Sequence, residues 1–151
     1  MDSDFSNNSM IAFLPDQGDW CEQDLPHMTL VFTGEIDALS PLVKNVLLKE
    51  TFLLSASMDP FTLRVTGLEK FGAENKVDVY TLEKTKDLVN ARYHVSVYDK
   101  SEFDFSPHVT IGKHRADRTM KNAPKFLTFS KIVFSWGPEK IVYPLAKKLD
   151  Y

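Results

Sequence analysis

Two short stretches decide the fold: "PHMTLV" at residues 26–31 and "PHVTIG" at residues 107–112. The chain has only four histidines, and two of them stand in the same phrase, Pro-His-apolar-Thr-apolar, 81 positions apart. In a β-strand the side-chain period is two, so His27 shares one face with Thr29, and His108 shares one with Thr110. The intervening residues then point into a core; these are Met28, Leu30, Val109 and Ile111.

The sequence that follows each motif also repeats. Each motif precedes a crossover and then a pair of strands across a turn, "FTLRVTGLEKFGAENKVDVYTL" at 61–82 and "FLTFSKIVFSWGPEKIVYPL" at 126–145. "GAEN" and Gly137-Pro138-Glu139 have the composition of hairpin turns. This repetition predicts an α+β fold built as a bilobal pseudo-two-fold duplication. Antiparallel sheets should line a central cleft, with helices outside.

Other elements follow from local pattern. Apolar or alternating runs predict strands at 10–15, 27–36 and 105–114. Ser40 and Pro41 have the residue types of a helix N-cap and first position. The apolar face of that helix should hold Leu42, Val46, Leu47, Leu53 and Leu54. Residues 84–100 begin as a helix, but "YHVSVY" (93–98) alternates like a strand, and the boundary stays open. We expect a flexible polar leader at 1–9 and a single domain at 10–151.

Composition narrows the class of protein. The chain is 43% hydrophobic and 26% charged, with a mean hydropathy of −0.23 and a net charge of −3. This balance is typical of a soluble globular protein, and it provides no general positive field for a long phosphate backbone. Cys21 is the only cysteine, so no internal disulfide can form. No signal peptide or membrane-spanning run is visible, and we expect a cytoplasmic protein without a membrane partner.

The paired motifs have a chemical use. If the halves face each other, two imidazoles and two hydroxyls meet around one site. A phosphodiester requires a base for the attacking oxygen and an acid for the leaving oxygen, and histidine can be either near neutral pH. Threonine hydroxyls can bind the non-bridging oxygens, where charge collects. Neither a metal nor another cofactor is required. A single His-x-Thr strand would more often be structural, and it is the repetition that favours catalysis.

These motifs resemble those of the two-histidine (2H) phosphoesterases. The superfamily includes RNA ligase-like cyclic phosphodiesterases and compact phage enzymes that cleave cyclic nucleotide immune signals. The resemblance extends from about residue 10 to residue 145. It implies a bilobal fold with a central cleft and metal-independent cleavage of phosphodiesters. It further implies that His27 and His108 are the acid–base pair, without saying which is the acid, and that Thr29 and Thr110 bind phosphate.

Charge and size favour a small substrate. The chain is short for an RNA ligase-like enzyme, and the loop before the first motif is acidic, with Asp16, Asp19, Glu22 and Asp24. We therefore expect cleavage of a cyclic nucleotide or a cyclic oligonucleotide messenger, and an anti-defence role in a host cytoplasm is a hypothesis if the chain is phage-encoded. One alternative is a 2′,3′-cyclic phosphodiesterase acting on RNA ends. Others are a nucleotide-binding sponge without turnover and a structural scaffold. The oligomeric state is not predicted.

Four aromatic residues are candidates for binding a base. Trp20 lies in the loop before the first motif, and Phe71 and Trp136 precede the turns of the two hairpins. Tyr143 lies in the last strand and suits the cleft or the core equally well. For Phe71 and Trp136, packing in the core or at the hairpin tip is an equal alternative. His94 and His114 lie outside both motifs, and we expect His114 to cap the end of its strand in solvent. Lys113 and Lys140 could supply positive charge near a phosphate, but such lysines are usually at the solvated surface. Metal-ligand spacings of the His-Glu-x-x-His kind are absent from the sequence.

Overall fold

The computed structural model describes residues 7–16, 26–72, 74, 76–101 and 104–146. The strands are β1 (Asn8–Pro15), β2 (Met28–Glu35), β3 (Phe61–Phe71), β4 (Val77–Leu82), β5 (His108–Lys113), β6 (Phe126–Trp136) and β7 (Glu139–Pro144). The helices are α1 (Pro41–Ser57) and α2 (Lys86–Val95), with 3₁₀ turns η2 (Ile36–Ala38), η3 (Ser96–Tyr98) and η4 (Met120–Asn122). The predicted strands are confirmed, with ends shifted by up to three residues. β1 begins two residues early, inside the stretch assigned to the leader.

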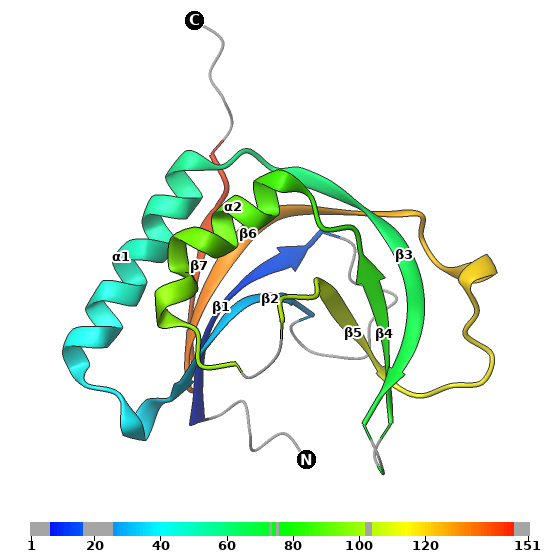
Figure 1. Ribbon diagram of the computed structural model, residues 1–151, viewed down its shortest axis with the longest axis horizontal. Helices are drawn as coiled ribbons and strands as arrows, with labels where there is room; N and C mark the ends of the chain where they lie inside the picture. The colour runs from blue at the N-terminus through cyan, green and yellow to red at the C-terminus, as the bar shows by residue number, and fades with distance from the viewer. Residues whose placement is uncertain (1–6, 17–25, 73, 75, 102–103, 147–151) are drawn as a thin grey trace, which may run out of the picture.

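Within these ranges the strands form one antiparallel sheet in the order β2-β1-β6-β3-β4-β5, with β7 paired to β6. The sheet curves strongly, and β2 and β5, the two ends of this order, contact each other (Figure 1). The strands that carry the two motifs are therefore neighbours in space. The predicted α+β fold of antiparallel strands and helices is confirmed.

The sheet is symmetric about the pairing of β3 with β6, where Leu63 lies opposite Leu127. An antiparallel pair has a local two-fold axis at such a position. The axis relates each residue of β3 to the residue 64 positions later in β6. Thr66 and Ser130 obey this relation, and each is the extra residue of a β-bulge. Backbone irregularities as well as regular strands are thus repeated in the two halves.

The same axis relates β4 to β1 and β5 to β2. Thr110 of β5 and Thr29 of β2 each lie opposite an aliphatic residue of the neighbouring strand. Each threonine is followed by a residue that the pairing skips, Ile111 in β5 and Leu30 in β2. The axis therefore places the two His-x-Thr segments on equivalent positions of the fold, and the predicted duplication is confirmed.

One part of the predicted repeat is wrong. The sequence matched the hairpin at 61–82 with the hairpin at 126–145, which would make β7 the counterpart of β4. The register makes β1 the counterpart of β4, and β7 has no counterpart in the described residues. The error has a simple cause: any antiparallel hairpin alternates in polarity, so alternation could not distinguish a true repeat from a similar hairpin.

The main core lies between the sheet and the two helices, which Figure 1 shows on the same side of the curve. As predicted, the motif strands send one residue in two into this core: Met28, Leu30, Val109 and Ile111 are each at most 2% exposed. Full burial of each such side chain contributes about 2 kcal/mol. The strands are thereby held in the register that turns the histidines and threonines to the opposite face.

Helix α1 begins as predicted, with Ser40 accepting a hydrogen bond from the Val43 amide, but its buried face was predicted only in part. Leu47 and Leu54 are buried, whereas Leu42 is 75% exposed, and Val46 and Leu53 are also exposed. The buried stripe is completed by Thr51 and Ser55. Their hydroxyls bond to carbonyls of their own helix, so polar residues pack there without an unmet hydrogen bond. Counting apolar residues alone therefore misplaced the face.

Helix α2 is capped by Thr85 and buries Leu88, Ala91 and Val95, a helical spacing. The chain then turns through η3, and the alternation of "YHVSVY" makes no strand. This segment instead lies along β2: the Lys100 amide donates to the Phe32 carbonyl at 2.7 Å, and Asp99 accepts from the Phe32 amide. Among the described residues, neither helix is long and apolar enough to cross a membrane.

Candidate active site

The two motifs lie on the sheet face that points away from the helices. His27 directly precedes β2, and His108 is the first residue of β5. Thr29 and Thr110 are half-buried and alternate with fully buried core residues. Because β2 and β5 contact each other and are related by the two-fold axis, the structure brings these four predicted residues to two neighbouring, equivalent strands. Each of the two motifs contributes one imidazole and one hydroxyl.

The ring of His108 is held by the backbone. Its Nδ1 lies 2.8 Å from the carbonyl oxygen of Ser106. A carbonyl oxygen only accepts, so Nδ1 carries the donated proton in the neutral ring, and Nε2 is left as the nitrogen that exchanges protons. Pro107 between them is buried, which fixes the short segment that makes this bond. The ring of His108 is thus held through Nδ1.

Phe71 is the aromatic candidate that reaches the site face. Its ring meets the His108 ring edge to face, with centroids 5.3 Å apart, and 38% of the residue is exposed. Beneath His108, Thr81 lies opposite it on β4 and shares a 2.9 Å hydrogen bond with Thr66. Gly67 lies opposite Thr81, and a Cβ there would stand only 2.8 Å from the Thr81 hydroxyl oxygen. His108 therefore has an aromatic ring at one edge and threonine hydroxyls on the strands beside it.

Thr29 of the first motif lies beside a methionine sulfur. Its hydroxyl lies 3.8 Å from the Met10 sulfur, which is a weak acceptor. A second, smaller apolar cluster lies on this face, formed by Met10, Ala12, Leu14 and Val133. A phosphate oxygen is a far better acceptor than a thioether, so the Thr29 hydroxyl can transfer its hydrogen bond to a ligand at little cost.

Two other aromatic candidates lie on the helix face. The Lys44 ammonium of α1 is 5.8 Å from the centre of the Trp136 ring, and Phe52 of α1 meets Tyr143 at 5.6 Å. Trp136 and Phe71 stand at matching places in the hairpins, but the axis pairs Phe71 with Ser135. Because successive residues alternate between faces, one position separates a site residue from a core residue. Trp20 lies outside the described residues.

The other two histidines contact carboxylates outside the motifs. His94 Nε2 of α2 lies 2.9 Å from Glu50 of α1. His114 Nδ1 lies 2.7 Å from Asp78, which also accepts from the Arg115 amide and the Arg118 guanidinium. Burial alone raises the pKa of Asp78, but these hydrogen bonds outweigh it and lower the pKa to about 2. His114 was expected to cap the strand end in solvent, and it instead anchors the end of β5 to a carboxyl group that is 2% exposed.

Of the two lysines considered, Lys140 is the one beside the site face. Its ammonium donates to the Ser135 hydroxyl at 2.9 Å across the pairing of β7 with β6. Lys113 is exposed at the end of β5.

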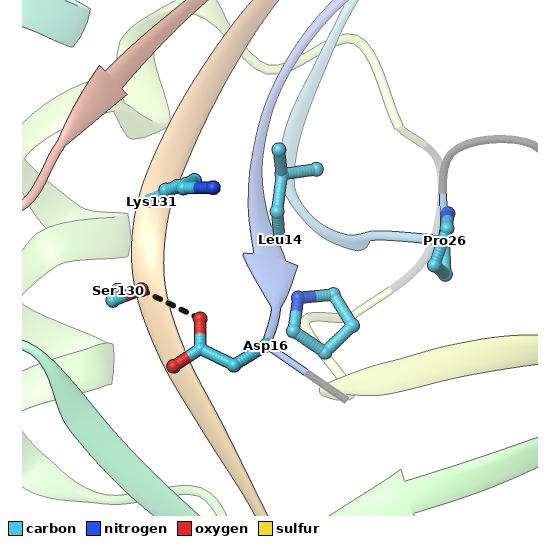
Figure 2. A pocket seen from close by; sticks show the side chains of 6 residues that line it. Leu14, Asp16, Pro26, Ser130 and Lys131 are labelled. Carbon is cyan, nitrogen blue, oxygen red and sulfur yellow. Dashed lines mark hydrogen bonds between the residues drawn. The ribbon is translucent and has the colours of Figure 1, made fainter. Parts of the chain in front are cut away.

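A pocket of about 370 Å³ opens beside His27, lined by Leu14, Pro15, Asp16, Pro26, Ser130 and Lys131 (Figure 2). Pro26 directly precedes His27. Since Phe13 pairs with Met28, the register sets Leu14 opposite position 27 and also opposite Lys131. None of these residues was predicted as a site residue. The pocket depends on the pairing of β1 with β6, which lie more than 100 positions apart in the chain, and no local pattern signals it.

A comparison with protein families identifies the family of this chain. The sequence pattern of the 2′-5′ RNA ligase superfamily matches residues 17–134, and the chain belongs to this superfamily. This is the superfamily of 2H phosphoesterases that the His-x-Thr motifs resemble.

Relatives support this assignment. A Bacillus licheniformis protein provisionally named a phosphoesterase is 33% identical over 99 residues, which are 61% of this chain and 54% of that protein. The chain spans about half the length of the curated relatives it matches. Among solved structures, TT0787 of Thermus thermophilus superposes with a TM-score of 0.59 at 14% identity, covering 92% of this chain and 95% of that one. Apo LigT of E. coli gives 0.52 at 17% identity, covering 93% and 95%. These structures share the fold.

Proposed function

We propose that this protein is a metal-independent phosphodiesterase that cleaves cyclic nucleotides or cyclic oligonucleotides by acid–base catalysis with His27 and His108. The observation that carries the proposal is the two-fold relation between the motifs, down to the bulge that follows each threonine. Catalysis of in-line displacement at phosphorus needs one proton-transfer group on each side, and a two-fold axis through the phosphate supplies that arrangement.

The proposed steps balance without a metal. One imidazole takes a proton from the attacking oxygen, which is a water molecule or a ribose 2′-hydroxyl. The new P–O bond forms as the bond to the leaving oxygen breaks, and the other imidazolium gives that oxygen a proton. For His108 the exchanging atom is Nε2, because Nδ1 is bonded to the Ser106 carbonyl. The symmetry allows either histidine to be the acid, depending on how the substrate lies.

The threonines bind the phosphate in this proposal. Thr29 and Thr110 lie two positions after the histidines on the same strand faces, as donors for the two non-bridging oxygens. Negative charge on these oxygens grows in the transition state, where such donors are most useful. Phe71, in contact with His108, is placed to pack against a base or ribose on that side.

A small substrate is favoured over a long nucleic acid. The net charge is −3, and the pocket beside His27 is of the size of one nucleoside rather than of a helical groove. LigT of E. coli was solved in complex with 3′-AMP, a nucleotide that carries one ribose phosphate. This neighbour favours, as a second candidate, opening of 2′,3′-cyclic phosphates at nucleotides or RNA ends.

The test is a substrate panel in EDTA: 2′,3′-cyclic mononucleotides, 3′,5′-cyclic mononucleotides, and cyclic di- and trinucleotides. Wild type is compared with His27→Ala, His108→Ala and a matched control, His94→Ala, whose histidine bonds to Glu50 between the helices. We expect turnover that survives chelation and the control but is lost in both motif variants.

Each outcome has a distinct meaning. Turnover of cyclic oligonucleotides would identify a signal-degrading enzyme, which an anti-defence role requires. Turnover of only 2′,3′-cyclic phosphates would favour processing of RNA ends. Binding without turnover in all four proteins would contradict the proposal of an enzyme and would favour a nucleotide-binding protein without turnover.

A further inference from the structure

The two sides of the proposed site are equivalent in backbone and unlike in side chains. Around His108 the axis-related positions hold Thr81, Gly67 and Thr66. Around His27 the same positions hold Leu14, Lys131 and Ser130. A phosphodiester on the axis has two substituents, and each would meet a different surface. The side chains of the pocket beside His27 should therefore decide which substituent of the phosphodiester binds on that side.

Three of the six residues that line that pocket are apolar, and three are polar or charged. The apolar ones are Leu14 and Pro15 of β1 and Pro26, which lies two residues before β2; Figure 2 shows Leu14 and Pro26. Proline rings and a leucine side chain pack well against the flat face of a heterocycle, and they offer no hydrogen bonds to a sugar or phosphate. The pocket volume of about 370 Å³ accommodates a purine with room for its ribose.

The polar groups of the pocket form a specific pattern. The Ser130 hydroxyl donates to one carboxylate oxygen of Asp16 at 2.6 Å, and the Asp16 amide donates to the Thr128 carbonyl, so this carboxylate is held in place. Lys131, next to Ser130 on β6, presents an ammonium group opposite Leu14. The pocket thus combines an anchored acceptor with a strong donor.

This pattern discriminates among ligands. Asp16 would repel a phosphate group and Lys131 would repel a cationic ligand, which leaves neutral groups that carry both donors and an acceptor. Guanine has two adjacent donors, N1–H and the 2-amino group, beside the O6 acceptor. Adenine and cytosine have a single exocyclic donor, and uracil has one N–H donor between two carbonyls. Guanine alone offers a carboxylate two donors and a lysine an acceptor along the same edge.

We infer that the pocket beside His27 is a guanine subsite, in which Asp16 accepts from N1–H and the 2-amino group, Lys131 donates to O6, and Leu14, Pro15 and Pro26 pack against the base. The inference rests on the proposed function, since it gives the substrate a guanosine on the His27 side. It makes Asp16 and Lys131 specificity-determining residues rather than catalytic ones.

The test measures binding and turnover separately. Calorimetry with the four 3′-mononucleotides gives the dissociation constants of wild type, Asp16→Asn, Lys131→Met and a control, Asp37→Asn, which alters an exposed aspartate in η2. We expect wild type and the control to bind 3′-GMP about 10- to 100-fold more tightly than 3′-AMP, as two hydrogen bonds to charged groups imply. Asp16→Asn should lose most of that preference while binding 3′-AMP unchanged, and Lys131→Met should lose part of it.

Turnover of the four 2′,3′-cyclic mononucleotides then separates the two claims. A guanine preference in KM, with similar kcat for all bases, supports the subsite. Equal binding and turnover of all four bases would overturn the subsite and leave the phosphodiesterase intact. A guanine preference in binding, with no turnover of anything, would support the subsite while the enzyme fails. Retention of the full preference in folded Asp16→Asn, with an unchanged melting temperature, would also overturn the assignment.

Discussion

The half around His27 and the half around His108 share one backbone and differ in nearly every side chain that surrounds the motif. Paired strands, bulges and the positions of histidine and threonine are repeated. The His108 half adds a ring contact with Phe71, a floor of threonines and the buried Asp78 cluster. The His27 half adds a pocket with Asp16 and Lys131. The comparison teaches that the backbone and the His-x-Thr side chains are symmetric here, whereas the side chains around each motif differ between the halves.

The most severe way to break the symmetry is to remove one imidazole. His27→Ala and His108→Ala should each lower kcat by about 10²- to 10⁴-fold, because each removes one of two proton transfers. The loss should be similar in both variants, measured by single-turnover kinetics with a 2′,3′-cyclic mononucleotide. A loss confined to one variant would mean that only one half carries out chemistry.

Removal of one hydroxyl should have the next largest effect. Thr29→Val and Thr110→Val keep the side-chain volume and remove a donor, so we expect kcat to fall by about 10²-fold in each. The melting temperature of Thr29→Val should not fall, since its neighbours Met10 and Ala12 are apolar. A variant that loses stability in step with activity would point to a structural hydroxyl instead.

The Asp78 cluster, which only one half has, should make the stability of the protein sensitive to acid. The pKa of Asp78 is lowered from 3.8 to about 2, so its carboxylate contributes about 2 kcal/mol above pH 5, and this is lost as pH falls from about 5 to 2. Urea unfolding at pH 6 and pH 3 should show this loss in wild type. Asp78→Asn should be less stable at pH 6 and should show a smaller decrease on acidification. Equal pH dependence in both proteins would contradict the role of this group.

The smallest expected effect concerns Gly67, a position that differs between the two halves. Gly67→Ala should cost about 1–2 kcal/mol of unfolding free energy, because the new methyl group would crowd the Thr81 hydroxyl. Thermal unfolding measures this cost. A double variant with Thr81→Ala should recover much of it, and failure to recover would assign the cost to something other than this contact.

The sequence allowed prediction of the features that nearby residues decide, such as strand faces and helix starts. It allowed little prediction of the features that depend on which residues pair across the sheet. The motif faces followed from a two-residue period, and Met28, Leu30, Val109 and Ile111 are buried as that period requires. The start of α1 followed from the chemistry of Ser40 and Pro41. These features are decided by neighbours in the chain, which a single sequence displays.

The failures share a different origin. Trp136 was matched to Phe71 by its distance from a turn, whereas bulges at Thr66 and Ser130 and the pairing of Leu63 with Leu127 decide the true equivalence. A one-residue offset exchanges the two faces of a strand. The pocket of Asp16 and Lys131 required knowledge that the first strand pairs with the sixth. Such information is held in long-range pairings, and alternation of polarity does not encode it.

The route of the chain between the halves has a consequence for how the molecule folds. From β2 the chain passes through α1 to β3, which pairs with β4 of the other half, and from β5 it returns to β6, which pairs with β1. The half with His108 is the continuous segment from β3 to β5, whereas the half with His27 takes its longest strand, β6, from beyond the other half's motif and is not complete as a continuous segment. We expect the two halves to unfold in one cooperative transition. During synthesis, β1 must wait for more than 100 residues before β6 emerges to pair with it, so the last third of the chain determines when the site is assembled.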